Sequence, residues 1–156
     1  MNYASPCPSP LGTLWMLANE SSITAILFPG NLPGADHMVQ ETPLLLEAKK
    51  QLSEYFCGKR HAFDLPLEPK GTPYQKTVWD ALKTIPYGET RSYGDIARQI
   101  QNPKGARSVG SANHNNPIPI IIPCHRVIGA NGSLTGYGGG LDIKTFLLHL
   151  EQNVTS

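Results

Sequence analysis

A cysteine and a histidine stand side by side at Cys124 and His125, within the run Pro-Cys-His-Arg-Val. Cysteine reacts as its thiolate, so a nearby group must take the proton or stabilise the charge. His125 is the obvious base, but adjacent side chains of an extended chain point to opposite faces, so a bridging water is expected between the two. A base that gains a proton needs a carboxylate, for which Glu151 is the leading candidate and Glu89 and Asp95 are alternatives. The pattern predicts nucleophilic chemistry at sulfur.

The segments on either side of this pair must position it. Residues 116–123 contain three prolines, which exclude a helix, and a run of isoleucines that predicts a short buried extended segment. A glycine-rich loop follows over residues 129–140, and a final amphipathic helix is expected from Asp142 to about Leu150. We therefore expect the extended segment to bring the cysteine from the core toward a cleft.

Two short helices are predicted just before this segment. A capping-box pattern at Ser92 opens the first, residues 101–105 form a turn, and the second spans residues 106–113. Such a pair is typical of a helix-turn-helix, whose second helix enters a DNA groove, although most such pairs simply pack inside a core. Small residues at Ala106 and Gly110 would let the second helix lie close to the minor groove.

The beginning of the chain has a different pattern. Two apolar, β-branched segments, residues 11–18 and 22–28, are joined by a plausible turn and predict a β-hairpin. A helix is expected over residues 43–58, and the polar, proline-containing stretch 61–70 then separates this part from a helix that begins at Thr72-Pro73.

These patterns predict an α+β fold with a domain boundary near residue 70. Residues 1–70 would form an N-terminal α/β domain with a small antiparallel sheet and a helix. Residues 71–156 would form a mostly helical C-terminal domain that contains the helix-turn-helix and the reactive cysteine.

Charge is distributed unevenly along the 156 residues, although the net charge is only +1. Residues 71–128 contain seven Lys or Arg against three Asp or Glu, whereas residues 1–70 contain five against seven. Local positive charge suits phosphate contacts, but a solvated basic face would account for it as well.

Three widely spaced cysteines argue against a disulfide framework and give little support to a structural zinc site. Cys7 and Cys57 are expected to be small buried hydrophobic residues. The sequence shows neither a membrane span nor a secretory signal, so an intracellular protein is expected.

The run around Cys124 resembles the active-site signature of the O6-alkylguanine-DNA alkyltransferases, also called methylated-DNA–protein-cysteine methyltransferases. The resemblance continues in order over more than half of the chain. It is carried further by residues 71–75, 85–90, 92–93, 107–110, 116–117, 136–141 and Glu151.

This resemblance implies DNA repair by direct, irreversible transfer of an alkyl group from O6-alkylguanine, or from O4-alkylthymine, to Cys124 after base flipping. His125 and Glu151 would form a water-linked relay that makes the thiolate, and Asn116 would help to hold this network. Tyr93 would donate a hydrogen bond to N3 of the flipped guanine.

The resemblance also implies contacts to substrate and DNA. Arg107 would insert into the base stack and fill the gap left by the flipped nucleotide. The Val127 carbonyl and the backbone around Gly138, where many relatives have serine, would hold the guanine edge. The other positions expected to contact substrate or DNA are Ser92, Ala106, Gly110 and Tyr137.

As partner, the resemblance implies double-stranded DNA bound through its minor groove by a monomer, with no cofactor, no metal and no membrane. The location would be cytoplasmic, with nucleoid association in a bacterium or archaeon, or nuclear in a eukaryote. Two alternatives stay open. A non-catalytic alkyl-lesion sensor or helix-turn-helix regulator would bind without removing the alkyl group, and a Cys-His hydrolase would turn over esters or peptides, although no oxyanion-hole motif is recognisable.

Overall fold

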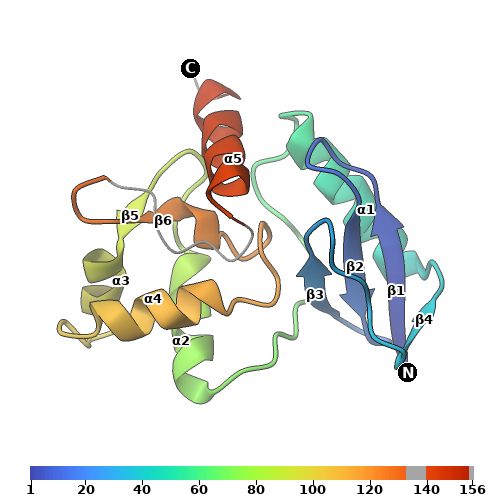
Figure 1. The fold of residues 1–156 in the computed structure, drawn as a ribbon, viewed down its shortest axis with the longest axis horizontal. Helices are drawn as coiled ribbons and strands as arrows, with labels where there is room; N and C mark the ends of the chain where they lie inside the picture. The colour runs from blue at the N-terminus through green and yellow to red at the C-terminus, as the bar shows by residue number, and fades with distance from the viewer. Residues whose placement is uncertain (133–139, 155–156) are drawn as a thin grey trace. The chain divides into compact units, whose positions relative to one another are not determined.

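The computed structural model describes residues 1–132 and 140–154. Backbone contacts divide the chain into two units, Met1–Lys70 and Gly71–Ser156, which are drawn in Figure 1 and described separately below. Within the described residues, no helix is both long and apolar enough to cross a lipid bilayer.

The first unit contains a four-stranded sheet with the strand order β3-β2-β1-β4. Its strands are β1 (Asn2–Cys7), β2 (Leu14–Ala18), β3 (Ile23–Leu27) and β4 (His37–Val39). The predicted hairpin corresponds to β2 and β3, whose turn is held by the Asn19 side chain accepting hydrogen bonds from the N–H groups of Ser21 and Ser22 at 2.9 and 2.8 Å. The short β4 runs parallel to β1, a pairing that the sequence pattern did not predict.

One helix, α1 (Pro43–Phe56), completes the first unit. Thr42 caps it, since its side-chain oxygen accepts a hydrogen bond from the N–H of Leu45 at 3.2 Å, and proline at the first helical position presets the backbone. The buried apolar side chains recur at helical spacing, as predicted, and are Leu45, Ala48, Leu52 and Tyr55.

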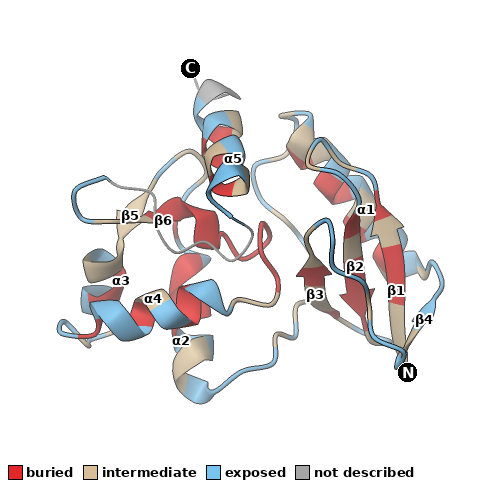
Figure 2. Cartoon of the chain, viewed as in Figure 1, coloured by how far each residue is buried: buried red, intermediate tan, exposed pale blue. Residues whose placement is uncertain are grey.

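The second unit is mostly helical. Its elements are α2 (Pro73–Leu82), β5 (Arg91–Ser92), α3 (Tyr93–Gln99), α4 (Ala106–His114), the 3₁₀ turn η1 (Cys124–Arg126), β6 (Val127–Ile128) and α5 (Leu141–Val154). The predicted helix-turn-helix corresponds to α3 and α4. Buried residues gather on α2, on α4 and around η1, as Figure 2 shows, so the core of this unit surrounds the segment that carries the cysteine.

Helix α2 supports α4 directly. The indole N–H of Trp79 in α2 donates a hydrogen bond to the main-chain oxygen of Ala112 in α4 at 2.8 Å, and both residues are buried. A buried indole N–H needs such a partner, and here it also satisfies one of the last carbonyls of α4. This hydrogen bond therefore helps to fix the position of α4 relative to α2.

The isoleucine-rich segment before Cys124 is a tight turn, so the predicted extended conformation is wrong. Pro119 and Ile122 form an isolated β-bridge across this turn, and Ile120 between them has a φ of 74°. Positive φ is unfavourable for a β-branched residue, so the surrounding packing must hold it in place. The backbone groups pair within the turn instead of with a neighbouring strand, which explains how so short a segment can be buried.

Candidate active site

Cys124 opens the 3₁₀ turn η1 and is buried, with 3% of its surface exposed. Its N–H donates to the carbonyl of Ile122 at 2.7 Å. Its own carbonyl accepts hydrogen bonds from the N–H of Val127 and from the side-chain amide of Asn113, the latter at 3.3 Å. Asn113 is a buried residue of α4 that the sequence analysis did not single out, and it connects that helix to the backbone of the cysteine.

His125 follows in η1, and the structure brings it to Glu151 on α5. Its Nε2 atom lies 2.6 Å from a carboxylate oxygen of Glu151, and both side chains are fully buried. Burial lowers the pKa of His125, and the positive charges of Arg126 and Lys144 act in the same direction, against the raising effect of Glu151. The ring is therefore neutral and donates its Nε2–H to the carboxylate.

The other ring nitrogen of His125 is then the basic one. A neutral imidazole that carries its proton on Nε2 has a lone pair on Nδ1. Within residues 1–132 and 140–154, this buried Nδ1 atom has no hydrogen-bond partner. The geometry thus leaves a proton acceptor available on the residue next to the cysteine.

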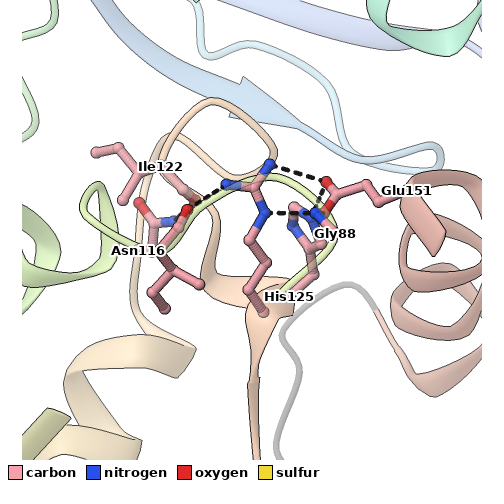
Figure 3. Close-up of polar contacts among 7 residues, drawn as sticks. Gly88, Asn116, Ile122, His125 and Glu151 are labelled. Atoms are coloured by element: carbon pink, nitrogen blue, oxygen red, sulfur yellow. Dashed lines mark hydrogen bonds and ion pairs between the residues drawn. The ribbon is translucent and has the colours of Figure 1, made fainter. Parts of the chain in front are cut away.

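Arg126 completes the buried charge network, although the sequence analysis gave it no role beyond its place in the motif. Its guanidinium donates to both carboxylate oxygens of Glu151, at 2.8 and 3.0 Å, and to the carbonyl of Ile85 at 2.7 Å. Glu151 also accepts a hydrogen bond from the N–H of Gly88 at 3.3 Å. Figure 3 shows Glu151 reaching from α5 toward His125 and Gly88.

Glu151 is ionised in this environment. Burial alone would raise its pKa, but the hydrogen bonds from His125 and Arg126, together with the positive charge of Arg126, hold the pKa well below the usual range for a carboxyl group. The other candidate carboxylates are engaged elsewhere: Glu89 pairs with Arg91, and Asp95 caps α3. Of the three carboxylates considered from the sequence, the structure places Glu151 against the histidine.

Asn116 holds the turn before the cysteine. Its side-chain amide donates to the carbonyl of Ile122 at 2.9 Å, and its side-chain oxygen accepts from the N–H of Ile118 at 3.0 Å. These bonds span the turn that contains Ile120, and Figure 3 shows Asn116 beside Ile122. Both hydrogen bonds are to backbone groups of the turn. Asn116 is therefore connected to the His125–Glu151 pair through the main chain.

Val127 lies in β6, beside the first residue of β5, and its carbonyl faces a second buried charge. The side-chain nitrogen of Lys144 on α5 donates to this carbonyl at 2.5 Å, and Lys144 is fully buried. Burial lowers the pKa of Lys144, whereas the negative form of Cys124 raises it. Nothing in the sequence around Lys144 indicates that it is buried.

Tyr93 and Ser92 lie at the start of α3. The Ser92 hydroxyl accepts a hydrogen bond from the N–H of Asp95 at 3.0 Å, which makes it the helix cap. Tyr93 is half-buried, and its ring lies over Gly110 of α4, where an added Cβ would be 3.7 Å from the nearest ring atom. The two helices of the helix-turn-helix thus meet at this aromatic ring.

The first turn of α4 is exposed and carries Ala106 and Arg107. Two other arginines of this unit, Arg91 and Arg98, form ion pairs with carboxylates. Arg107, by contrast, makes no ion pair within the described part of the chain. Its guanidinium is therefore not held by a neighbouring carboxylate there.

Two predicted substrate-binding positions, Tyr137 and Gly138, lie outside the described residues. Within the described ranges, no cluster of His, Cys, Asp and Glu side chains could hold a metal ion. Cys7 is buried as expected, but Cys57 is exposed, so the expectation that it is a buried hydrophobic residue is wrong. Cys57 follows the last residue of α1 as its C-terminal cap.

Family models match both units of the chain. Residues 73–153 match the DNA binding domain of the 6-O-methylguanine DNA methyltransferases. Residues 2–69 match the ribonuclease-like domain of the same group.

Individual relatives are similar over almost the whole length. The chain is 52% identical over 152 residues to a methylated-DNA–protein-cysteine methyltransferase of Methanosarcina acetivorans, covering 96% of this chain and 97% of the relative. It is 48% identical over 161 residues to the constitutive methylated-DNA–protein-cysteine methyltransferase of Bacillus subtilis, covering 97% and 96%. The crystal structure of Mycobacterium tuberculosis OGT in complex with DNA matches with a TM-score of 0.90 and 47% identity, covering 97% of this chain and 94% of that one.

Proposed function

The chain belongs to the 6-O-methylguanine DNA methyltransferase family, and from this premise we propose that it repairs DNA by moving the alkyl group of O6-alkylguanine onto Cys124. The observation that carries the proposal is the buried cysteine joined in sequence to the His125–Glu151–Arg126 network. This reaction needs a nucleophile, a base with an available nitrogen, and a carboxylate that orients the base.

The proton and electron balance of the transfer is simple. Cys124 gives its thiol proton, through one bridging water, to Nδ1 of His125, while Glu151 stabilises the imidazolium that forms. The thiolate attacks the alkyl carbon, the carbon–O6 bond breaks, and its electron pair stays on the guanine. The relay proton then neutralises the released guanine, so that a thioether and an unmodified base result. Water cannot readily displace the cysteine sulfur from the alkyl carbon of a thioether, so each protein molecule would act once.

The alkyl carbon is out of reach inside a duplex, so the base must leave the stack, which costs a few kcal/mol. We propose that α4 binds the minor groove, where Ala106 and Gly110 allow close approach and Arg107 fills the gap. Tyr93 would then donate a hydrogen bond to N3 of the flipped guanine, which improves it as a leaving group. O4-alkylthymine would be a second substrate by the same route.

The guanine edge would meet the Val127 carbonyl. A carbonyl oxygen has two lone pairs, so it can accept from the guanine amine while it also accepts from Lys144. The protein would act as a monomer and without a cofactor. Nothing in the chemistry above needs an external electron or group donor.

A label-transfer experiment tests the proposal. Duplex DNA that carries O6-methylguanine with a labelled methyl group is incubated with the wild type, with Cys124→Ser and with Cys57→Ser. Cys57 is a suitable control because it is an exposed thiol of the other unit. The wild type and Cys57→Ser should each take up one methyl group per molecule, and Cys124→Ser none.

Two outcomes would contradict the proposal. Tight binding of the lesion with no label on the protein would indicate a lesion sensor. Label uptake by Cys124→Ser would move the acceptor to another residue. Binding of DNA by Cys124→Ser should stay close to that of the wild type, because the hydroxyl changes only the reacting atom.

A further inference from the structure

Lys144 is the residue whose burial the proposed relay does not explain. It is a lysine with no exposed surface, next to the segment that carries the nucleophile. Lysine is almost never fully buried without a compensating interaction, because removing an ammonium from water is costly. One such interaction is the hydrogen bond of 2.5 Å to the carbonyl of Val127, three residues after Cys124.

Helix α5 therefore presents two opposite charges to one short segment. Lys144 and Glu151 are seven residues apart, which is about two helical turns, so they share one face of α5. Lys144 contacts the carbonyl of Val127, just after η1, and Glu151 contacts His125 and Arg126 within it. A cation and an anion are thus aligned along the turn that begins with the cysteine.

The charges around the cysteine can be counted. Arg126 and Glu151 are a bidentate ion pair and cancel, and His125 is neutral for the reasons given above. Tyr87, which faces this pair from the preceding turn, stays neutral because burial and the charge of Glu151 raise its pKa. With a protonated Lys144, this set has a charge of +1 while Cys124 is a thiol, so a positive charge is in place near the sulfur before its proton moves to His125.

Thermodynamic coupling runs in both directions. The negative form of Cys124 raises the pKa of Lys144, which means that the thiolate stabilises the ammonium. By reciprocity, the ammonium stabilises the thiolate by the same free energy. The neutral forms of Lys144 and Cys124 and their ion pair contain the same number of protons. The low polarity of the site favours the neutral forms, whereas the hydrogen bond to the carbonyl of Val127 favours the ammonium.

We propose that the Lys144 ammonium is the charge that stabilises Cys124 as a thiolate when His125 takes its proton, while Glu151 and Arg126 fix the geometry of this proton transfer. This rests on the proposed function in one respect, namely that the thiolate is the attacking group. Lys144 is a positioning residue, because it acts on Cys124 and on the Val127 carbonyl and not on the alkyl group itself.

The test compares three substitutions by their pH profiles. Lys144→Met keeps the length of the side chain and removes the charge, Lys144→Arg keeps the charge, and Lys83→Met is a control at an exposed lysine of the same unit. The probe is iodoacetamide, with modification of Cys124 followed by peptide mass spectrometry from pH 6 to pH 10. Label transfer from O6-methylguanine DNA is measured in parallel.

We expect Lys144→Met to react about tenfold more slowly than the wild type at pH 7, since loss of a nearby opposite charge reduces the thiolate fraction by about that factor. The deficit should close as the pH rises and the thiol ionises without help. Lys144→Arg and Lys83→Met should keep the position of the wild-type profile. A Lys144→Met profile that coincides with the wild type, or one lowered equally at every pH, would overturn the proposal.

Thermal unfolding distinguishes this role from a structural one. Lys144→Met removes the cost of burying an ammonium but takes the donor from the carbonyl of Val127, so its unfolding temperature should lie close to that of the wild type. A less reactive but equally stable variant supports a role in reactivity, whereas a lower unfolding temperature with an unchanged profile would assign Lys144 to structure alone. If the wild type takes no label from DNA, the proposed function fails, but the iodoacetamide profiles still decide the role of Lys144.

Discussion

The side-chain amide of Asn113 lies 3.3 Å from the main-chain oxygen of Cys124, so the helix proposed to bind DNA is bonded directly to the backbone of the nucleophile. Asn113 belongs to the last turns of α4, whereas Arg107 belongs to its first turn. Arg107 and Cys124 are therefore linked through one helix and one hydrogen bond. A shift of α4 on DNA would be transmitted to Cys124 through this hydrogen bond.

Replacing Asn113 by alanine should remove this connection. We expect the variant to lose about 1 to 3 kcal/mol of stability, because one hydrogen bond to a buried carbonyl is lost. Transfer from duplex DNA and reaction with free O6-benzylguanine should both slow. Asn115→Ala is the matched control, since Asn115 is exposed and its side-chain amide donates to the carbonyl of Ser111 in the same helix. Unchanged rates for Asn113→Ala would show that the contact is not needed for reactivity.

Acid should destabilise the second unit in two steps. The pKa of His125 lies below its ordinary value of 6.5 in the folded protein, so the unfolded chain takes up that proton first as the pH falls below 6.5. The pKa of Glu151 lies below its ordinary value of 4.5, so its contribution is present above pH 4.5 and is lost as the pH falls further. Urea unfolding between pH 7 and pH 3 measures both.

Glu151→Gln isolates the second step. It should cost about 3 to 5 kcal/mol at pH 7, because it leaves the charge of Arg126 buried without its carboxylate. Its stability should also vary less with pH below 4.5 than that of the wild type. Glu89→Gln serves as control, because Glu89 is exposed and pairs with Arg91 at the surface. Equal acid sensitivity of the wild type and Glu151→Gln would place the titrating carboxylate elsewhere.

Arg107→Ala should separate base flipping from chemistry. Repair of O6-methylguanine in duplex DNA should slow by about tenfold, or ~1.4 kcal/mol in the barrier, because the flipped state loses the side chain that fills its gap. Reaction with free O6-benzylguanine needs no flipping and should proceed at the wild-type rate. Arg98→Ala removes an equal charge from the neighbouring helix α3 and should affect both substrates little. An equal loss on both substrates would contradict the flipping role.

Gly110→Ala should stabilise the fold and weaken binding to DNA. An added Cβ would lie 3.7 and 3.8 Å from two ring atoms of Tyr93, which is ordinary contact distance, and Gly110 lies within a helix. Replacing a helical glycine by alanine is worth about 0.5 to 1 kcal/mol. A rise in unfolding temperature together with a larger Kd for duplex DNA would show that Gly110 serves the interface with DNA. Unchanged binding would assign it to packing only.

Local signals in the sequence predicted the helices well. Thr72-Pro73 and Ser92 mark helix starts through hydrogen bonds that stay within four residues, and the apolar spacing of α1 defines its buried face. The pairing of β4 with β1 was not predictable in this way, because parallel strands carry no turn signal between them. The turn around Ile120 was also missed, since nothing in the residue types announces a positive φ at isoleucine.

The candidate site shows the same division. Cys124 and His125 were found from their adjacency and from the resemblance to a family, and Glu151 from the expectation that a base needs a carboxylate. Arg126 was not assigned a role, because its acceptor at Ile85 lies 41 residues away in sequence and depends on the fold. Asn113 and Lys144 were missed for the same reason: nothing in an asparagine or a lysine on a short helix shows that it will be buried.

The burial of Cys124 bears on how a protein that acts once, as proposed, keeps its cysteine intact until it meets a lesion. An electrophile that alkylates the reactive thiolate inactivates the molecule, just as a lesion does. With 3% of its surface exposed, Cys124 is shielded from collisions with larger electrophiles, while Cys57 offers an ordinary exposed thiol on the other unit. In the proposed mechanism the thiolate depends on groups of two separate elements, η1 with His125 and Arg126 and α5 with Lys144 and Glu151, so an unfolded chain would lack this activation. Selectivity for the lesion would therefore begin before DNA is bound, because the sulfur becomes reactive only in the folded protein.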